Sequence, residues 1–301
     1  MRPCTTLFAV ASSFSSNAPP PTHRLFFTYK LGNSLYVPLT SRCNSRTLPQ
    51  LRGNNFVLPA SVVSSLCRVR DAEAGTSEWA EWCAYLDTAD EPQILPHALE
   101  PVEQISPSQQ QPKLDDLFHE IQRELLQSSN NGIDGSSAPT MLKSIVFSGE
   151  GEPLLRFNDM LCLAKCIRKA VSASSPIAAS DSSTNIRLTT NGLPPFFQEG
   201  NNSTSHLLQQ CLDSGISQVS VGLITWDEDQ YQELMQPLLP PRCNIAAHKL
   251  VCEFIQTAVQ LEGMDVEITA VDRDDVDKEK TEALSRSLGV TTPIRWRPYF
   301  P

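Results

Sequence analysis

The chain has 301 residues, of which 40% are hydrophobic and 19% charged, a composition typical of a soluble globular protein that can bury one large core. The first 70 residues hold seven Arg, one Lys and no acidic residue, so the other 231 carry a net charge of −18 within a total of −10. An acidic body disfavours nucleic acid as a partner. No apolar run approaches the roughly 20 residues of a membrane helix, so no membrane partner is expected.

Changes in amino-acid composition along the chain indicate where the expected domain begins and where it is interrupted. Residues 1–26 are rich in Ser and lack acidic residues, which fits a disordered tail or an organelle transit peptide. The location is accordingly cytoplasmic or organellar, in a plastid or mitochondrion. Residues 27–301 are expected to form one domain with a flexible insertion at about 75–112, where "LEPVEQISPSQQQP" is of low complexity. Nine scattered Cys, an odd number, indicate reduced thiols.

Strand and helix patterns alternate along this domain. A first strand is expected within 35–43, before a basic loop, and helical periodicity follows within 59–74 and 113–127. Further strands are expected at 144–148, 185–190, 217–224, 265–272 and 293–298, with helical segments between them. Continuous Val- and Ile-rich strands alternating with helices predict an α/β fold with a parallel sheet covered by helices. The number of strand–helix units, about six, is in the range found in partial or complete (β/α) barrels.

Four polar loops each follow a predicted strand. They read "SRCN", "SGEGEP", "TTNG" and "TAVDR". Because ligand loops of parallel α/β folds lie at the carboxyl ends of the strands, we expect these loops to meet on one face. Ser148 to Pro153 is expected to line a pocket there.

The order and spacing of these blocks resemble the radical S-adenosylmethionine (SAM) superfamily, most closely the TatD-associated radical SAM proteins. The resemblance runs from about Phe27 to the C-terminus, outside the insertion. It rests on "LYVPLTSRCN", "VFSGEGEPLLR", "IRLTTNG" and "VEITAVDRDDVD" with the final "IRWRPYF". It implies a partial (β/α)6 barrel in which the Gly-Glu-Pro loop contacts the amino group of SAM.

The resemblance also implies which residues line a cofactor pocket. The Gly-Glu-Pro contact carries over to Gly151, Glu152 and Pro153, whereas Glu150 stands at a more variable position. Thr190 and Asn191 are further candidates, although "TTNG" is nearly as compatible with a plain turn at the end of a strand. The candidate cofactor-binding residues are Ser148, Gly149, Glu150, Gly151, Glu152, Pro153, Thr190 and Asn191.

The cluster motif of the superfamily is degenerate in this chain. The resemblance implies Cys-x3-Cys-x2-Cys after the first strand, where three thiolates hold a [4Fe-4S] cluster. Cys43 stands at the first position, but Thr47 and Gln50 occupy the other two. A hydroxyl and a carboxamide are harder and weaker ligands than thiolate, so a [4Fe-4S] cluster is not expected.

Two further observations agree with this loss. The Cys-x3-Cys pair of Cys162 and Cys166 has helical spacing and favours core packing over ligation. Gly222 and Ile224 follow a strand at which the superfamily has a polar Ser and Asn near its ligand, which would weaken contacts to SAM.

Three hypotheses about function follow. The favoured one is a pseudoenzyme, a degenerate barrel that binds SAM or a related small molecule without radical chemistry. The second is an active radical SAM enzyme whose cluster uses Cys43 with atypical ligands or a second chain. The third is a module that binds a protein partner through the Trp-containing insertion and the basic loop around Arg42, Arg46 and Arg52.

Overall fold

The computed structural model describes residues 27–73, 114–130, 142–174, 184–193, 204–239 and 245–301. The tail expected at 1–26 and the insertion expected at 75–112 lie outside the described residues. In chain order the elements are β1 (Tyr29–Leu31), β2 (Ser34–Val37), α1 (Leu48–Leu51), α2 (Ala60–Glu73), α4 (Leu114–Asn130), β3 (Ser144–Phe147), the 3-10 helix η2 (Pro153–Arg156), α5 (Phe157–Ser174), β4 (Asn185–Thr190), α6 (Thr204–Asp213), β5 (Ile216–Gly222), α7 (Glu228–Met235), α8 (Ala247–Gln260), β6 (Asp265–Asp272), α9 (Lys278–Ser287) and β7 (Arg295–Pro298).

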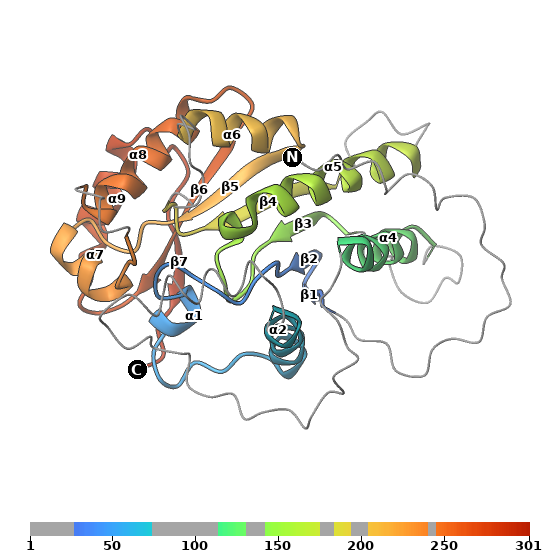
Figure 1. The fold of residues 1–301 in the computed structure, drawn as a ribbon. Helices are drawn as coiled ribbons and strands as arrows, with labels where there is room; N and C mark the ends of the chain where they lie inside the picture. The colour runs from blue at the N-terminus through green and yellow to red at the C-terminus, as the bar shows by residue number, and fades with distance from the viewer. Residues whose placement is uncertain (1–26, 74–113, 131–141, 175–183, 194–203, 240–244) are drawn as a thin grey trace, which may run out of the picture.

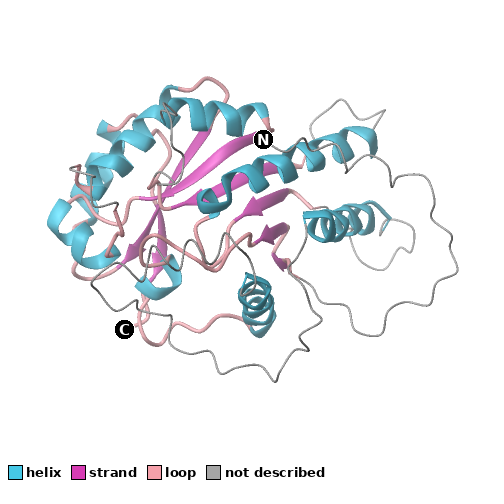
Figure 2. Ribbon diagram, viewed as in Figure 1, coloured by secondary structure: helices cyan, strands magenta, loops and turns pink. Residues whose placement is uncertain are grey.

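One mixed sheet organises the domain. Its strands follow chain order from β1 to β7; β1 pairs antiparallel with β2, and all other neighbours are parallel. The sheet curls into a half-barrel with α4, α5, α6, α8 and α9 arched around its outside (Figures 1 and 2). The structure therefore confirms an α/β fold with six parallel strands and the shape of a partial barrel.

The outer face of the sheet carries the core. Side chains alternate along each strand, and paired residues of neighbouring strands share a face. On the outer face Leu188 lies beside Val219 and Ala270 beside Trp296, and the Trp296 indole N–H donates to Glu282 of α9 at 3.2 Å. Apolar strand residues on this face and inward residues of the helices form one continuous buried cluster.

The inner face, here called the concave face, has a different composition. The same registers place Tyr36 beside Val146, Val146 beside Arg187, and Arg187 beside Gln218. This face carries Tyr36, Val146, Arg187, Thr189, Gln218, Ser220, Glu267, Thr269, Arg295 and Arg297. The sheet is thus apolar on its outer face and mostly polar on its concave face, where Val146 and Val271 are buried apolar exceptions.

The strand bounds agree with the sequence in some places and differ in others. The predictions of 185–190 and 265–272 are confirmed by β4 and β6. The first predicted strand was too long, because β2 ends at Val37 and Pro38 has no N–H with which to continue the ladder. The strand predicted at 217–224 ends at Gly222, because the chain makes a tight turn at Ile224. The edge strand β1 was not predicted.

No helix in the described part of the chain is long and apolar enough to cross a membrane.

Candidate functional site

The loops after β2, β3 and β4 meet at one end of the half-barrel, as expected for the carboxyl ends of parallel strands. The residues that join them are Cys43, Asn44, Ser45, Glu152, Thr190 and Asn191, here called the mouth cluster.

Glu152 is the centre of the mouth cluster. Its side chain is 2% exposed, and its carboxylate accepts hydrogen bonds from Thr190 Oγ1 at 2.8 Å and from the Asn191 backbone N–H at 2.8 Å. It also accepts from the backbone N–H of Leu154 at 3.0 Å, which caps η2 at the position before Pro153. The loop after β3 and the end of β4 are thus held together by one acidic side chain.

Gly151 lets two loops approach each other closely. A Cβ atom at this position would lie 2.4 Å from the backbone oxygens of both Thr40 and Arg42. The next residue, Glu152, donates its backbone N–H to the same Arg42 oxygen at 2.7 Å. Position 151 therefore accepts only glycine unless the backbone shifts. The absence of a side chain at this position lets the loop that contains Glu152 pack directly against the loop that contains Cys43.

Asn191 joins the Cys43 loop to the end of β4. Its side-chain amide donates to Asn44 Oδ1 at 2.6 Å and to Ser45 Oγ at 2.9 Å, and it lies 3.6 Å from Cys43 Sγ. The amide oxygen accepts from the backbone N–H of Leu193 at 2.9 Å, which fixes the orientation of the amide.

Cys43 is held as a neutral thiol. Its Sγ contacts Ser45 Oγ at 3.6 Å in addition to the Asn191 amide. The residue keeps some solvent exposure, but burial of the sulfur, followed by the charge of Glu152, raises the pKa of the thiol to about 12. The structure shows free thiols at Cys43, Cys162, Cys166, Cys211 and Cys252, and of these five only Cys43 lies in the mouth cluster. A thiol that resists ionisation is a poor nucleophile.

Thr47 and Gln50, the other two positions of the cluster motif, form the start of a helix. Thr47 is the N-cap of α1, Pro49 lies in the first turn, and Gln50 Oε1 accepts from the Thr47 backbone N–H at 2.7 Å. This is the reciprocal arm of a capping box. The pattern Thr-x-x-Gln is visible in the sequence and could have predicted the cap. The described residues contain no group of three or more His, Cys, Asp or Glu side chains able to hold a metal ion.

The remaining residues of the "SGEGEP" loop support its path. The Ser148 backbone N–H donates to the oxygen of Val37 at 3.4 Å, and Gly149 lies against Pro38. Glu150 is 7% exposed, and Pro153 begins η2 as a buried residue. Of the eight predicted cofactor-binding residues, the structure brings Glu152, Thr190 and Asn191 into direct contact, and the others shape the loop around them.

Protonation of Glu152 is the main electrostatic feature of the site. Burial raises the pKa of this carboxyl to about 7, against the lowering effect of its three hydrogen-bond donors. Near neutral pH the mouth cluster therefore holds an acid that can bind or release a proton without leaving its place.

Tyr231 of α7 is a residue that the sequence did not single out. It is fully buried, its hydroxyl has no hydrogen-bond partner among the described residues, and its ring lies 5.3 Å from that of His248. Burial raises the pKa of the phenol well above its usual value. Asn44 is also fully buried, and its side-chain amide nitrogen has no acceptor among the described residues. Two buried donors at or near the mouth cluster therefore have no acceptor in the part of the chain that the structure describes.

Ile224 adds a strained backbone at the same end of the barrel. Its φ angle is 62°, and the backbone N–H of Thr225 donates to the oxygen of Leu223 at 2.8 Å, which makes a γ-turn centred on Ile224. A β-branched residue rarely adopts this conformation. The Ile224 side chain is 1% exposed, so burial of an apolar group offsets the strain. A buried core residue thus stands where the resemblance led us to expect a polar one.

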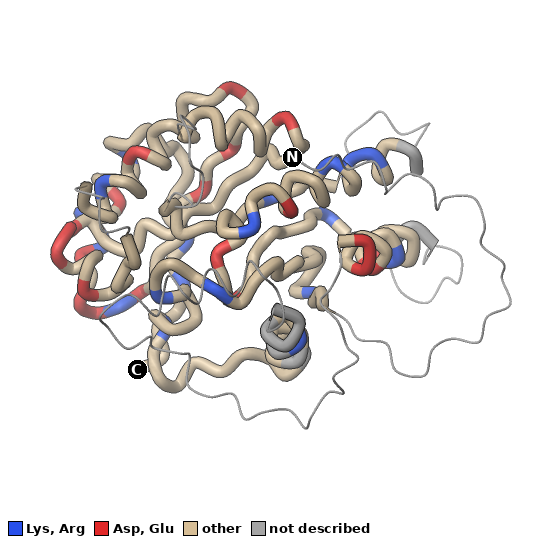
Figure 3. Tube along the Cα trace, in the orientation of Figure 1, with Lys and Arg blue, Asp and Glu red and all other residues tan. Residues whose placement is uncertain are grey.

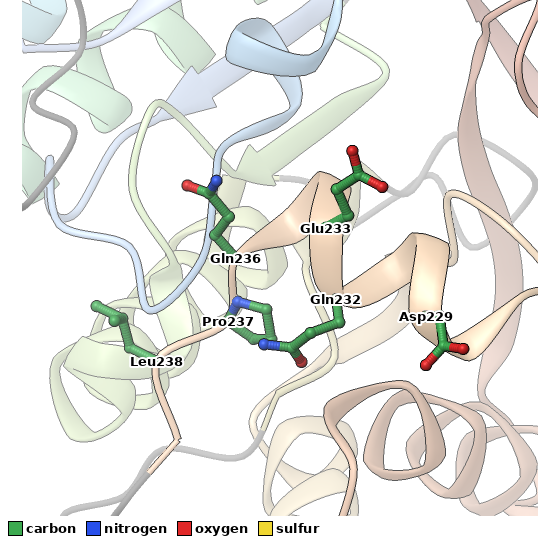
Figure 4. A pocket seen from close by; sticks show the side chains of 6 residues that line it. All are labelled: Asp229, Gln232, Glu233, Gln236, Pro237 and Leu238. Carbon is green, nitrogen blue, oxygen red and sulfur yellow. The ribbon is translucent and has the colours of Figure 1, made fainter. Parts of the chain in front are cut away.

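A separate surface pocket of about 400 Å³ lies beside α7 (Figure 4). Side chains of α7 and of the segment after it line the pocket: Asp229, Gln232, Glu233, Gln236, Pro237 and Leu238. Figure 3 shows acidic residues over this helix. The pocket segment is bonded to the Cys43 loop, because the backbone N–H of Leu238 donates to the oxygen of Asn44 at 2.8 Å. The lining residues are not members of the mouth cluster.

A scan against models of protein families finds none that matches the chain, and a search of curated proteins finds no match.

Proposed function

We propose that this protein is a degenerate radical-SAM-like barrel, which binds SAM or a related small molecule at the mouth of the half-barrel without a [4Fe-4S] cluster. The observation that carries the proposal is the helical cap at positions 47 and 50. The resemblance puts cluster thiolates at these two positions, whereas Thr47 and Gln50 are bonded to each other as the N-terminus of α1.

The chemistry of the donor set does not fit an iron–sulfur cluster. One thiol with a raised pKa, one hydroxyl residue and one carboxamide replace three thiolates. No step that requires a cluster-bound radical is therefore assigned to the protein.

The mouth retains features that suit a polar small molecule. The Glu152 carboxylate accepts three hydrogen bonds, and a carboxylate has room for about four. The Tyr231 hydroxyl and the Asn44 amide nitrogen are buried donors without an acceptor among the residues that the structure describes. Buried polar groups are nearly always paired in folded proteins, so these donors favour a polar ligand as their partner.

The test is calorimetric titration of the iron-free protein with SAM. Without a cluster to chelate the amino and carboxylate groups, we expect an affinity about a thousandfold weaker than a cluster-bearing site would give, a loss of roughly 4 kcal/mol. Glu152→Gln should abolish the remaining binding, whereas Glu253→Gln on the exposed surface of α8 removes the same charge and should leave it unchanged. Low-micromolar affinity in the wild-type protein, or binding that survives Glu152→Gln, would contradict the proposal.

A further inference from the structure

The concave face of the half-barrel carries more positive than negative charge. The strand registers place Arg187 of β4 and Arg295 and Arg297 of β7 on this face. The acidic residues that share it are Glu267 and, at the exposed start of β6, Asp265. The protein as a whole is acidic, so a group of three arginines inside the barrel is a local feature and not a consequence of composition.

One carboxylate serves two of these arginines. Glu267 Oε2 lies 3.8 Å from Arg187 Nη1, and Glu267 Oε1 lies 3.5 Å from Arg295 Nη1. Both distances are long for charge-assisted hydrogen bonds, which are usually about 2.7–2.9 Å. Glu267 therefore satisfies the guanidinium groups only in part.

Two guanidinium donors on this face are buried without an acceptor. The Nε–H groups of Arg187 and Arg297 are inaccessible to solvent and have no hydrogen-bond partner among the residues that the structure describes. Burial, followed by the charge of Arg295, lowers the pKa of Arg297. Burying a charged donor without a partner costs free energy, so such a group is expected to have an anionic acceptor in use.

Arg297 lies close to the mouth. It is paired in register with Val271 near the carboxyl end of β6, and Pro298, its neighbour in the chain, accepts a hydrogen bond from Arg52 Nε at 3.0 Å. Arg52 itself is occupied, because its guanidinium lies 3.9 Å from the centre of the Phe56 ring and 5.2 Å from that of Phe300. Arg297 is thus next in the chain to the residue that bonds Arg52 at the end of α1, and its Nε–H has no acceptor among the described residues.

We propose that the concave face binds the anionic group of a small molecule, a carboxylate or a phosphate, with Arg297 as its main ligand and Arg187 and Arg295 as supporting charges. Guanidinium groups match both anions through paired N–H donors. The site shares no residue with the mouth cluster, since its arginines are Arg187 of β4 and Arg295 and Arg297 of β7, and it does not depend on SAM binding.

The experiment is titration of the full chain with inorganic phosphate and, separately, with succinate, at constant ionic strength set with chloride. Saturable binding is followed by calorimetry and by the shift of Tm. We expect a Kd on the order of 1 mM for one of the two anions, and which of them binds more tightly distinguishes a phosphate site from a carboxylate site. Arg297→Gln should weaken this binding at least tenfold. Arg286→Gln on the outer helix α9 removes the same charge far from the concave face and should leave it unchanged.

A third variant separates a binding role from a structural one. Glu267→Gln removes the carboxylate that competes for Arg187 and Arg295, so anion binding should become several-fold tighter. If Arg297→Gln does not fold, Arg297→Lys, which keeps the charge and loses the paired donors, takes its place with the same expected loss. The proposal is overturned if neither anion binds saturably in the wild-type protein. It is equally overturned if the arginine variants and Arg286→Gln bind alike, or if Glu267→Gln weakens binding.

Discussion

The carboxylate of Glu152 accepts the backbone N–H of Asn191 at 2.8 Å and thereby joins the loop after β3 to the end of β4. The same Asn191 donates through its side chain to Asn44 and Ser45, so three loops of the half-barrel are connected through this pair. The carboxyl is buried and its pKa is about 7, which makes the connection sensitive to pH.

The first prediction concerns stability and pH. Because the folded-state pKa of Glu152 is raised from 4.5 to about 7, the native protein binds more protons than the unfolded chain between these values. The contribution of Glu152 to the free energy of unfolding is therefore fully present below pH 4.5 and falls as pH rises to about 7, by up to about 3 kcal/mol.

This contribution is isolated by Glu152→Gln, which cannot ionise. The variant should be less stable than wild type at low pH, and the difference should shrink as pH rises through about 7. Denaturant unfolding over this range measures it, with Glu253→Gln as the control in which the difference from wild type stays nearly flat. A pH-independent cost of Glu152→Gln would show that the carboxyl titrates normally.

The second prediction concerns the close approach of two loops. Gly151→Ala places a Cβ atom 2.4 Å from two backbone oxygens, and backbone cannot move as easily as a side chain. The free energy of unfolding should fall by about 1–3 kcal/mol. Gly222→Ala is the control, because the nearest atoms to its Cβ are 3.8 Å away and its stability should change by less than about 0.5 kcal/mol. Equal effects at the two positions would contradict the packing described at Gly151.

The third prediction concerns the buried phenol of Tyr231. In the ligand-free protein the Tyr231 hydroxyl has no partner among the described residues, and an unpaired buried hydroxyl destabilises the fold, so Tyr231→Phe should raise the free energy of unfolding by about 1 kcal/mol. Tyr299→Phe, at a partly exposed site near the C-terminus, should have little effect. A loss of stability in Tyr231→Phe would mean that the hydroxyl has a partner in solution.

The fourth prediction concerns the reactivity of Cys43. With a pKa of about 12 instead of 9, its thiolate fraction at neutral pH is lower by about a thousandfold than in an unstructured chain. Alkylation by iodoacetamide, followed for the peptide that contains Cys43 by mass spectrometry, should be slower by a comparable factor in native protein than in urea. Similar rates in both states would place the sulfur in a more polar environment than the structure shows.

Sequence reasoning located β4 and β6 because "NIRLTT" and "DVEITAVD" are rich in β-branched residues and begin after polar segments. It missed β1, whose three residues are too short to establish a period of two. The contact between Glu152 and Asn191 could have been predicted, since both residues follow strands that were expected to be parallel. The position of Tyr231 could not have been predicted, because nothing in the α7 sequence shows that its aromatic residue faces a loop nearly 190 positions earlier. The helix cap formed by Thr47 and Gln50 could have been predicted from the pattern Thr-x-x-Gln, but the same two positions had been interpreted as part of a cluster motif.

We propose that the side chains at positions 47 and 50 prevent a [4Fe-4S] cluster from forming beside Cys43. Restoring both thiolates with Thr47→Cys and Gln50→Cys removes the Gln50 arm of the cap and gives Cys43 two partners at the spacing that the superfamily uses.

Anaerobic reconstitution with iron and sulfide, followed by absorbance and by electron paramagnetic resonance of the reduced sample, tests this claim most directly. The account predicts no stable cluster in the wild-type chain, a reducible [4Fe-4S] signal in the double variant, and loss of that signal when Cys43→Ala is added. Near-stoichiometric iron and sulfide with a reducible signal in the wild-type protein would contradict it.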